Sequence, residues 1–231
     1  MKIGIIGAGH IGGTLTRRLT QLGHEVRVAN SRGPETLTEL AEETGATPVT
    51  VRDAVRDVEL IVVTIPQANV RDLPDDLFDD VPEDVVVVDT GNYYPRQRDG
   101  RIDEIEEGMP ESRWVEQQLG HPVVKAFNNI WAQHLMDRGR PAGSPDRIAL
   151  PVAGDNEKAK HTVLELVEEL GFDAVDAGGL DESWRQQPGT PVYTADLDAE
   201  GVRQALKEAR RDRLPEFRAT EHSPGTFENP A

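Results

Sequence analysis

The stretch KIGIIGAGHIGG, residues 2–13 of a chain of 231 residues, decides the fold. Its first half is a continuous apolar run, which is typical of a strand covered on both faces of a sheet. Its second half places glycines at 7, 9 and 12, and apolar residues then recur at helical spacing from Ile11 to Leu22, until Gly23. A second strand candidate follows at 25–30, where apolar and polar residues alternate over Glu25-Val26-Arg27-Val28. Strand, glycine-rich turn, helix and strand within about 30 residues predict a phosphate-binding βαβ unit.

The glycine turn predicts where the phosphates of a dinucleotide bind. Gly7 permits a tight turn, Gly9 lets a pyrophosphate approach the backbone, and Gly12 allows the helix to pack closely on the strand. The helix begins near His10 and Ile11, where unpaired N–H groups and the positive end of the helix dipole favour negative charge. We therefore predict that Gly7, Gly9, His10, Ile11 and Gly12 contact the cofactor. A glycine-rich turn without a ligand is the alternative.

The end of the second strand indicates which dinucleotide is bound. An acidic residue there would bind the ribose hydroxyls of NAD, but the sequence reads Asn30-Ser31-Arg32. A carboxylate would repel a 2′-phosphate, whereas Ser31 can donate a hydrogen bond to it and Arg32 can form a charge-assisted pair. We therefore predict NADP(H) as the cofactor, with Asn30, Ser31 and Arg32 in its site. A polar turn before Pro34 is the alternative.

Apolar runs and helical patterns alternate through the rest of the chain. Strand candidates lie at 2–7, 25–30, 46–51, 60–66, 84–90, 123–127, 148–153 and 172–176. This alternation implies right-handed crossovers and a mainly parallel sheet. We predict a doubly wound α/β domain of the Rossmann type over residues 1–180. Residues 181–231 are predicted to add a helix from about Asp198 to Leu214 and a polar tail, which could lie at a homodimer interface.

Other strand ends should meet the glycine turn at one edge of the sheet, where ligands of such sheets bind. Thr64-Ile65-Pro66 and Gly91-Asn92 end two of the predicted strands, and small or amide residues there would let a nicotinamide lie against the backbone. We therefore predict that all five contact the cofactor. The predicted contacts of the hydride acceptor are Phe127, Asn128, Trp131 and Trp184.

The aromatic residues on the acceptor side have a second interpretation. Trp131, Trp184 and Tyr193 could form walls for a planar ring, or they could be core or interface residues. No catalytic residue is assigned. Lys125 is the best candidate for a proton donor, but a structural or solvated role is the favoured interpretation.

The composition disfavours several classes of function. Acidic residues outnumber basic ones by 42 to 25, and the net charge of −17 argues against nucleic acids and anionic membranes as partners. Cysteine is absent and the histidines lack metal-binding spacing, so no metal site is predicted. We expect Arg17, Arg18 and Arg32 to offset the acidic charge near the glycine turn.

The same features bear on where the protein acts. No apolar run approaches the length of a membrane span, and the first strand begins at residue 2 without room for a signal peptide. We expect a cytoplasmic protein whose partners are small-molecule redox cofactors.

Several motifs together resemble the NADPH-dependent reductases of coenzyme F420 and the related cytosolic domain of the STEAP metalloreductases. The matching segments are the glycine turn, Ser31-Arg32, Val63-Thr64-Ile65-Pro66, Pro151-Val152-Ala153-Gly154-Asp155 and Asp176-Ala177-Gly178-Gly179-Leu180. The resemblance implies reversible hydride transfer between NADPH and the 5-deazaflavin ring of F420. It also implies phosphate contacts at the glycine turn, Ser31 and Arg32, and nicotinamide contacts at Ile65 and Pro66. Residues 127–131 and 184–193 depart from the pattern of the family.

Three functions remain open on the sequence. The preferred one is an NADP-dependent oxidoreductase that passes hydride directly from ring to ring, with coenzyme F420 as the acceptor. The second is an NADPH-dependent reductase of another acceptor, such as a flavin, an imine or a carbonyl compound. The third is a non-catalytic NADP(H)-binding sensor whose C-terminal segment contacts a protein.

Overall fold

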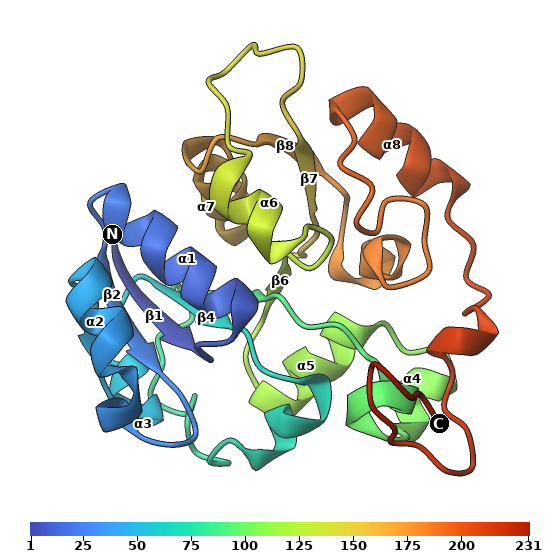
Figure 1. Ribbon diagram of the computed structural model, residues 1–231, viewed down its shortest axis with the longest axis horizontal. Helices are drawn as coiled ribbons and strands as arrows, with labels where there is room; N and C mark the ends of the chain where they lie inside the picture. The colour runs from blue at the N-terminus through green and yellow to red at the C-terminus, as the bar shows by residue number, and fades with distance from the viewer.

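A computed structural model describes residues 1–231, and its centre is a six-stranded parallel sheet (Figure 1). The strands are β1 (Lys2–Ile6), β2 (Glu25–Ala29), β3 (Thr47–Pro48), β4 (Leu60–Val63), β5 (Val86–Asp89) and β6 (Val124–Lys125). Their order across the sheet is β3-β2-β1-β4-β5-β6. The chain therefore winds outward from β1 in both directions, which is the doubly wound Rossmann topology. The predicted fold class is confirmed, and every strand lies inside a predicted apolar run.

Helices cover both faces of this sheet. They are α1 (His10–Gln21), α2 (Thr38–Thr44), α3 (Val51–Ala54), α4 (Asp103–Glu106), α5 (Glu111–Leu119), α6 (Ala132–Asp137), α7 (Glu157–Glu169) and α8 (Ala199–Glu208). One core contains Leu15 of α1, Leu135 of α6 and Val167 of α7, and a second core contains Ala54 of α3 and Trp114 of α5. None of the helices has the length and apolar composition needed to cross a membrane.

A second, two-stranded sheet continues the first through a narrow junction. Its strands β7 (Ala149–Val152) and β8 (Asp173–Asp176) are parallel to each other. A single antiparallel bridge pairs Lys125 of β6 with Ala153, and the two residues exchange N–H···O bonds of 2.7 and 3.0 Å. The end of β6 and the residue that follows β7 therefore meet at this bridge.

The C-terminal part of the chain packs on the smaller sheet. Val202 and Leu206 of α8 share an apolar cluster with Ala149 of β7 and Val175 of β8. The helix begins after its N-cap Asp198 as predicted, but it ends at Glu208 rather than near Leu214. The structure thus gives α8 a place on the folded chain, and the homodimer stays a prediction.

Candidate functional site

The turn after β1 can be built only from glycines at two positions. Gly7 has φ +111°, and a Cβ on it would lie 2.3 Å from the carbonyl oxygen of Thr64. A Cβ on Gly12 would lie 2.0 Å from the carbonyl oxygen of Gly7. Any side chain at these positions would overlap backbone, because β1, β4 and the start of α1 are in direct contact there. The structure therefore gives Gly7 and Gly12 the packing roles predicted from the sequence.

Gly9 differs from its two neighbours because the space beside it is empty. A Cβ on Gly9 would have no atom within 4 Å. Gly9 is the N-cap residue of α1, no side chain caps this end, and the first turn carries no acidic residue. The first bond of the helix runs from the Gly13 N–H to the Gly9 oxygen (2.8 Å), so the preceding N–H groups have no partner within the helix. The open space and unpaired N–H groups fit a pyrophosphate.

A closed hydrogen-bonded turn at the end of β2 presents Arg32. The Asn30 side chain accepts a bond from the Arg32 backbone N–H (2.9 Å) and donates one to the Thr36 hydroxyl (2.9 Å). The Thr36 hydroxyl in turn donates to the Gly33 oxygen (2.8 Å). These bonds fix the turn through its backbone, so the exposed Arg32 guanidinium remains available for an anion.

The predicted cofactor residues converge on one cleft at the carboxyl ends of β1, β2 and β4. The cleft has a volume of about 530 Å³. Predicted residues that line it are Gly7, Gly9, Asn30, Ser31, Arg32, Thr64, Ile65 and Pro66. His10 lines an adjoining groove of about 730 Å³, which also reaches Gly9 and Arg32. Ile11 packs against the core, and Gly91 and Asn92 lie at the neighbouring end of β5.

Sequence reasoning missed one end of this cleft. The additional lining residues include Val51, Asn69, Asp72, Leu73 and Pro74. The apolar side chains among them can enclose a flat ring, and the Asn69 amide donates a bond to Asp72 (3.2 Å) at its polar edge. The pair Leu73-Pro74, apolar within an acidic stretch, was the available signal.

Two basic residues expected near the phosphates are engaged elsewhere. Arg17 forms a bidentate pair with Glu43 through bonds of 2.7 and 2.6 Å. Arg18 donates to the carbonyl oxygens of Leu135, Met136 and Leu170, and burial lowers the pKa of its guanidinium. The expectation that three arginines offset the charge here therefore holds only in part. Arg17 lines the groove beside the glycine turn but is paired with Glu43, and Arg32 alone faces the cleft without a carboxylate partner.

A buried ion pair supports the end of β5. Lys125 of β6 is fully buried and donates to Asp89 (2.9 Å) and to the Gly91 carbonyl oxygen (2.5 Å). Asp89 also accepts bonds from the Gly91 N–H (2.7 Å) and the Ser112 hydroxyl (2.8 Å). The Asp89 carboxylate and the Lys125 ammonium thus hold both backbone groups of Gly91, so the structure gives Lys125 a positioning role rather than one as a proton donor.

Two of the predicted acceptor contacts lie inside the protein. Phe127 is a core residue with no exposed surface, and its backbone has φ +61°. Asn128 is buried, donates to the Asn92 side chain (3.0 Å) and the Gln186 carbonyl (2.7 Å), and accepts from the Gln186 amide (3.0 Å). The prediction that these side chains touch the acceptor is corrected, because the Phe127 ring is enclosed in the core and the Asn128 amide is bonded to Asn92 and Gln186.

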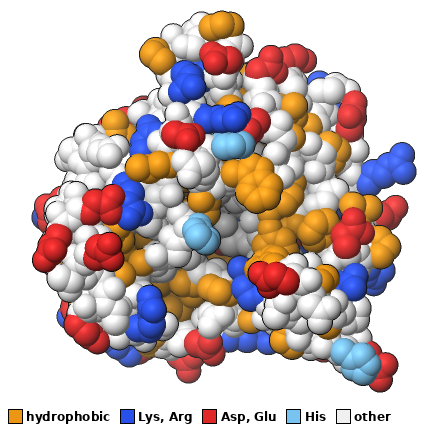
Figure 2. All heavy atoms as spheres, viewed as in Figure 1, with side chains coloured by type: hydrophobic (Ala, Val, Ile, Leu, Met, Phe, Trp, Pro, Cys, Tyr) orange, Lys and Arg blue, Asp and Glu red, His pale blue; other side chains and the backbone are white.

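The two tryptophans predicted on the acceptor side keep more accessible positions. Trp131 precedes α6 and is 57% exposed, the highest exposure of any tryptophan here. Trp184 is half-buried, with the guanidinium groups of Arg185 and Arg211 at 4.4 and 5.3 Å from its ring. Figure 2 shows a hollow in this face of the molecule, and hydrophobic side chains gather around part of its rim.

The N-terminal part of the chain matches a known family. Residues 2–93 match the model of the NADP oxidoreductases described as coenzyme F420-dependent. The Escherichia coli protein YjhV is 43% identical over 91 residues, which cover 37% of this chain and 66% of that protein. The rat metalloreductase STEAP3 is 29% identical over 180 residues, which cover 78% of this chain and 34% of that protein. The matched region therefore spans less than two thirds of either relative.

Solved structures extend the likeness beyond residues 2–93. The hypothetical protein SMa0349 of Sinorhizobium meliloti is 30% identical with a TM-score of 0.72, covering 85% of this chain and 95% of that one. An Arthrobacter protein assigned as an F420-dependent NADP reductase is 24% identical with a TM-score of 0.61, covering 78% and 86% of the two chains. The Arthrobacter protein shares the fold of this chain. On the family match and the curated relatives together, this chain resembles the coenzyme F420-dependent NADP oxidoreductases over its N-terminal part.

Proposed function

We propose that this protein binds NADPH in the cleft at the glycine turn and transfers hydride directly to the deazaflavin ring of coenzyme F420. The observation that carries the cofactor assignment is the state of Arg32. In a chain with 42 acidic residues, its guanidinium faces the cleft with no carboxylate partner, and only its backbone N–H is bonded, to Asn30. The 2′-phosphate of NADPH would supply the negative charge that pairs with the Arg32 guanidinium.

The residues around Arg32 fit the rest of the dinucleotide. The space beside Gly9 and the free N–H groups at the start of α1 would hold the pyrophosphate. Val51, Leu73 and Pro74 would enclose the adenine, since they line the far end of the same cleft. Ile65, Pro66, Gly91 and Asn92 would face the nicotinamide, from the ends of β4 and β5.

Direct hydride transfer requires little acid–base catalysis by the protein. NADPH supplies a hydride from C4 of its nicotinamide, and C5 of a deazaflavin accepts it while a proton from solvent completes the reduction. The side chains need only hold the two rings in contact and exclude water. This requirement agrees with the locked state of Lys125, whose ammonium group is committed to Asp89 and Gly91.

Access at the acceptor side supports a planar acceptor. Trp131 is exposed before α6 and presents an indole face on which a planar ring could stack. Trp184 approaches from the C-terminal segment, with two guanidinium groups against its ring. We keep both tryptophans as proposed acceptor contacts.

The test mixes the purified protein with NADPH and F420 under anaerobic conditions and follows the loss of F420 absorbance. We expect turnover that depends on both compounds and is much slower with NADH. Parallel reactions replace F420 by riboflavin, a cyclic imine or a ketone. Turnover with one of these but not with F420 would contradict the acceptor assignment. NADPH binding without turnover of any acceptor would indicate a sensor.

A further inference from the structure

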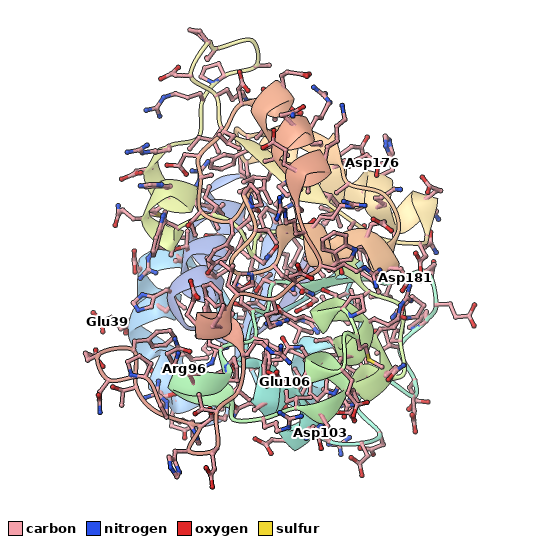
Figure 3. The ribbon with its side chains drawn as sticks, turned by 90° about the vertical axis from the view of Figure 1, so that its right-hand side faces the viewer. Glu39, Arg96, Asp103, Glu106, Asp176 and Asp181 are labelled. Atoms are coloured by element: carbon pink, nitrogen blue, oxygen red, sulfur yellow. The ribbon has the colours of Figure 1, made fainter.

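The segment between α8 and Phe227, here called the strap (residues 210–227), returns from α8 to the β5 side of the molecule. Figure 3 shows it descending from α8 toward the labelled Arg96 and Glu106. It contains one short helical turn, Pro215–Phe217, and lies outside the part of the chain matched by the family model. Its course places aromatic side chains beside the loop that follows β5.

Two carboxylates that are almost fully buried anchor the strap. Glu111 has no exposed surface and accepts a bond of 2.8 Å from the Arg213 guanidinium. Glu106, whose side chain is 2% exposed, accepts a bond of 2.8 Å from the Ala219 backbone N–H. A buried carboxylate needs such partners, because leaving it unpaired in the interior is costly. The strap is therefore held at residues 213 and 219 as part of the folded core.

The aromatic residue between these anchors packs against a tyrosine of the β5 loop. The rings of Phe217 and Tyr94 are 6.4 Å apart, and the Phe227 ring meets Tyr94 edge-on at 5.4 Å. Gly189 makes room for Phe217, since a Cβ on Gly189 would lie 2.9 Å from the Phe217 ring. The hydroxyls of Tyr94 and Tyr193 are hydrogen-bonded. Tyr94, Tyr193, Phe217 and Phe227 thus form one cluster, called here the aromatic wall.

The aromatic wall is tied to the strand ends where the acceptor would bind. Arg98 lies 5.3 Å over the Tyr94 ring and donates a 2.7 Å bond to the Asn92 carbonyl oxygen. Beside Tyr193, the Thr194 N–H donates a 2.8 Å bond to the carbonyl oxygen of Asn129, which follows β6. Burial raises the pKa of both phenols, so the wall is uncharged at neutral pH. It remains partly open to solvent, since Phe227 is 61% exposed.

We propose that the strap completes the acceptor compartment, and that its Phe217, packed on Tyr94, determines the affinity for a planar heteroaromatic acceptor. This inference rests on the proposed function and adds the element that selects the acceptor. Uncharged aromatic faces bind planar rings through stacked or edge-on contacts, with little dependence on the substituents of the ring. The nucleotide cleft shares no residue with the wall, so the strap does not line the cleft proposed for the adenine and the phosphates.

The experiment compares three variants of the full chain. Phe217→Ala removes the ring, and Gly189→Ala displaces it without removing it. Gly23→Ala is the matched control, because Gly23 and Gly189 both have φ +88° and a Cβ on Gly23 meets no atom within 4 Å. Each protein is saturated with NADP⁺ and titrated with F420, whose fluorescence reports binding. NADPH affinity and steady-state KM for F420 are measured in parallel.

We expect Phe217→Ala and Gly189→Ala to weaken F420 binding by about 3- to 10-fold, the range of one aromatic contact. NADPH affinity should stay within about twofold in all variants, and Gly23→Ala should bind F420 like the parent, because no protein atom near it moves. Unchanged F420 affinity and KM in Phe217→Ala, with normal turnover by the parent, would overturn the strap's role and leave the proposed function standing. Equal losses for F420 and NADPH would also overturn it. A parent that binds NADPH but not F420 or riboflavin would overturn both.

Discussion

Asp89 and Lys125 form a 2.9 Å ion pair inside the sheet, at the ends of adjacent strands β5 and β6. Their side chains are 2% and 0% exposed. The pair also binds both backbone groups of Gly91, through the Asp89–N–H bond and the Lys125–O bond. The backbone that follows β5 is thus fixed by charge rather than by a strand ladder.

Removing the cation of this pair should lower the stability of the protein. Lys125→Met leaves the Asp89 carboxylate buried with only neutral donors, and we expect a loss of about 3–5 kcal/mol in the free energy of unfolding. Urea denaturation measures the loss. The double variant Asp89→Asn/Lys125→Met should lose less than Lys125→Met alone, because no unpaired charge remains. A proton donor would behave differently: its removal would lower kcat while unfolding stayed unchanged.

Alanine at two glycines of the same turn should have opposite consequences. Gly9→Ala adds a Cβ to open space, so stability should change by less than about 0.5 kcal/mol, while NADPH affinity falls about tenfold or more. Gly12→Ala forces a Cβ onto the Gly7 carbonyl, and we expect a loss of about 2–3 kcal/mol in stability. Thermal unfolding and NADPH titration of both variants separate the two effects. Unchanged NADPH affinity in Gly9→Ala would show that Gly9 has no ligand-binding role.

Replacing Arg32 should change the choice between the two dinucleotides. Arg32→Ala should weaken NADPH binding by about 1.5–3 kcal/mol, the value of a charge-assisted hydrogen bond, and leave NADH binding nearly unchanged. Isothermal titration with each nucleotide measures the difference. Arg101→Ala is the control, since Arg101 is a surface arginine paired with Asp103. A parallel loss for NADPH and NADH would mean that Arg32 does not contact the 2′-phosphate.

Asp155 should make the stability of the protein depend on pH in the acid range. Burial alone would raise the pKa of Asp155, but bonds from the Leu180 N–H (2.8 Å) and the Arg113 guanidinium (2.8 Å) outweigh it and hold the pKa below its usual value. The ionised form is therefore favoured by folding. Its contribution is complete above the unfolded value of about 3.9 and is lost as the pH falls through the folded pKa.

The corresponding measurement is urea unfolding between about pH 5 and pH 2. Asp155→Asn should be less stable than the parent at neutral pH and should lose less stability on acidification. Asp79→Asn, at an exposed position without an ion pair, should keep the slope of the parent. If the stability of Asp155→Asn depended on pH as strongly as that of the parent, the acid dependence would not come from Asp155.

The sequence was informative wherever a local pattern decides the structure. Apolar runs located every strand, and the spacing of Gly7, Gly9 and Gly12 located the phosphate turn, because turn geometry depends on neighbours along the chain. The prediction that Phe127 contacts the acceptor was wrong. Its backbone adopts φ +61° after β6 and its ring enters the core, and a run of apolar residues does not indicate this. The sequence pattern indicated a strand end but not the direction of the side chain.

Contacts between distant segments could not be predicted from the sequence. Glu111 and Arg213 are 102 positions apart, and each is an ordinary surface residue in its own helical or loop pattern. The sequence indicates no partner for Arg17, whereas in the structure Glu43 of α2 forms an ion pair with it. In an acidic chain almost any arginine can find a carboxylate, so which one remains unpaired is decided by tertiary structure.

The one-residue junction between β6 and Ala153 has a consequence for how such proteins can diversify. A long ladder would bind the two sheets to one register, so that a change in one would require matching changes in the other. Here only Lys125 and Ala153 pair across the junction, so the ladder leaves the register of the second sheet free. The two halves are instead joined by side chains, since Leu15 of α1 and Val167 of α7 share one core. A change beyond the junction therefore has to preserve this packing rather than a strand register.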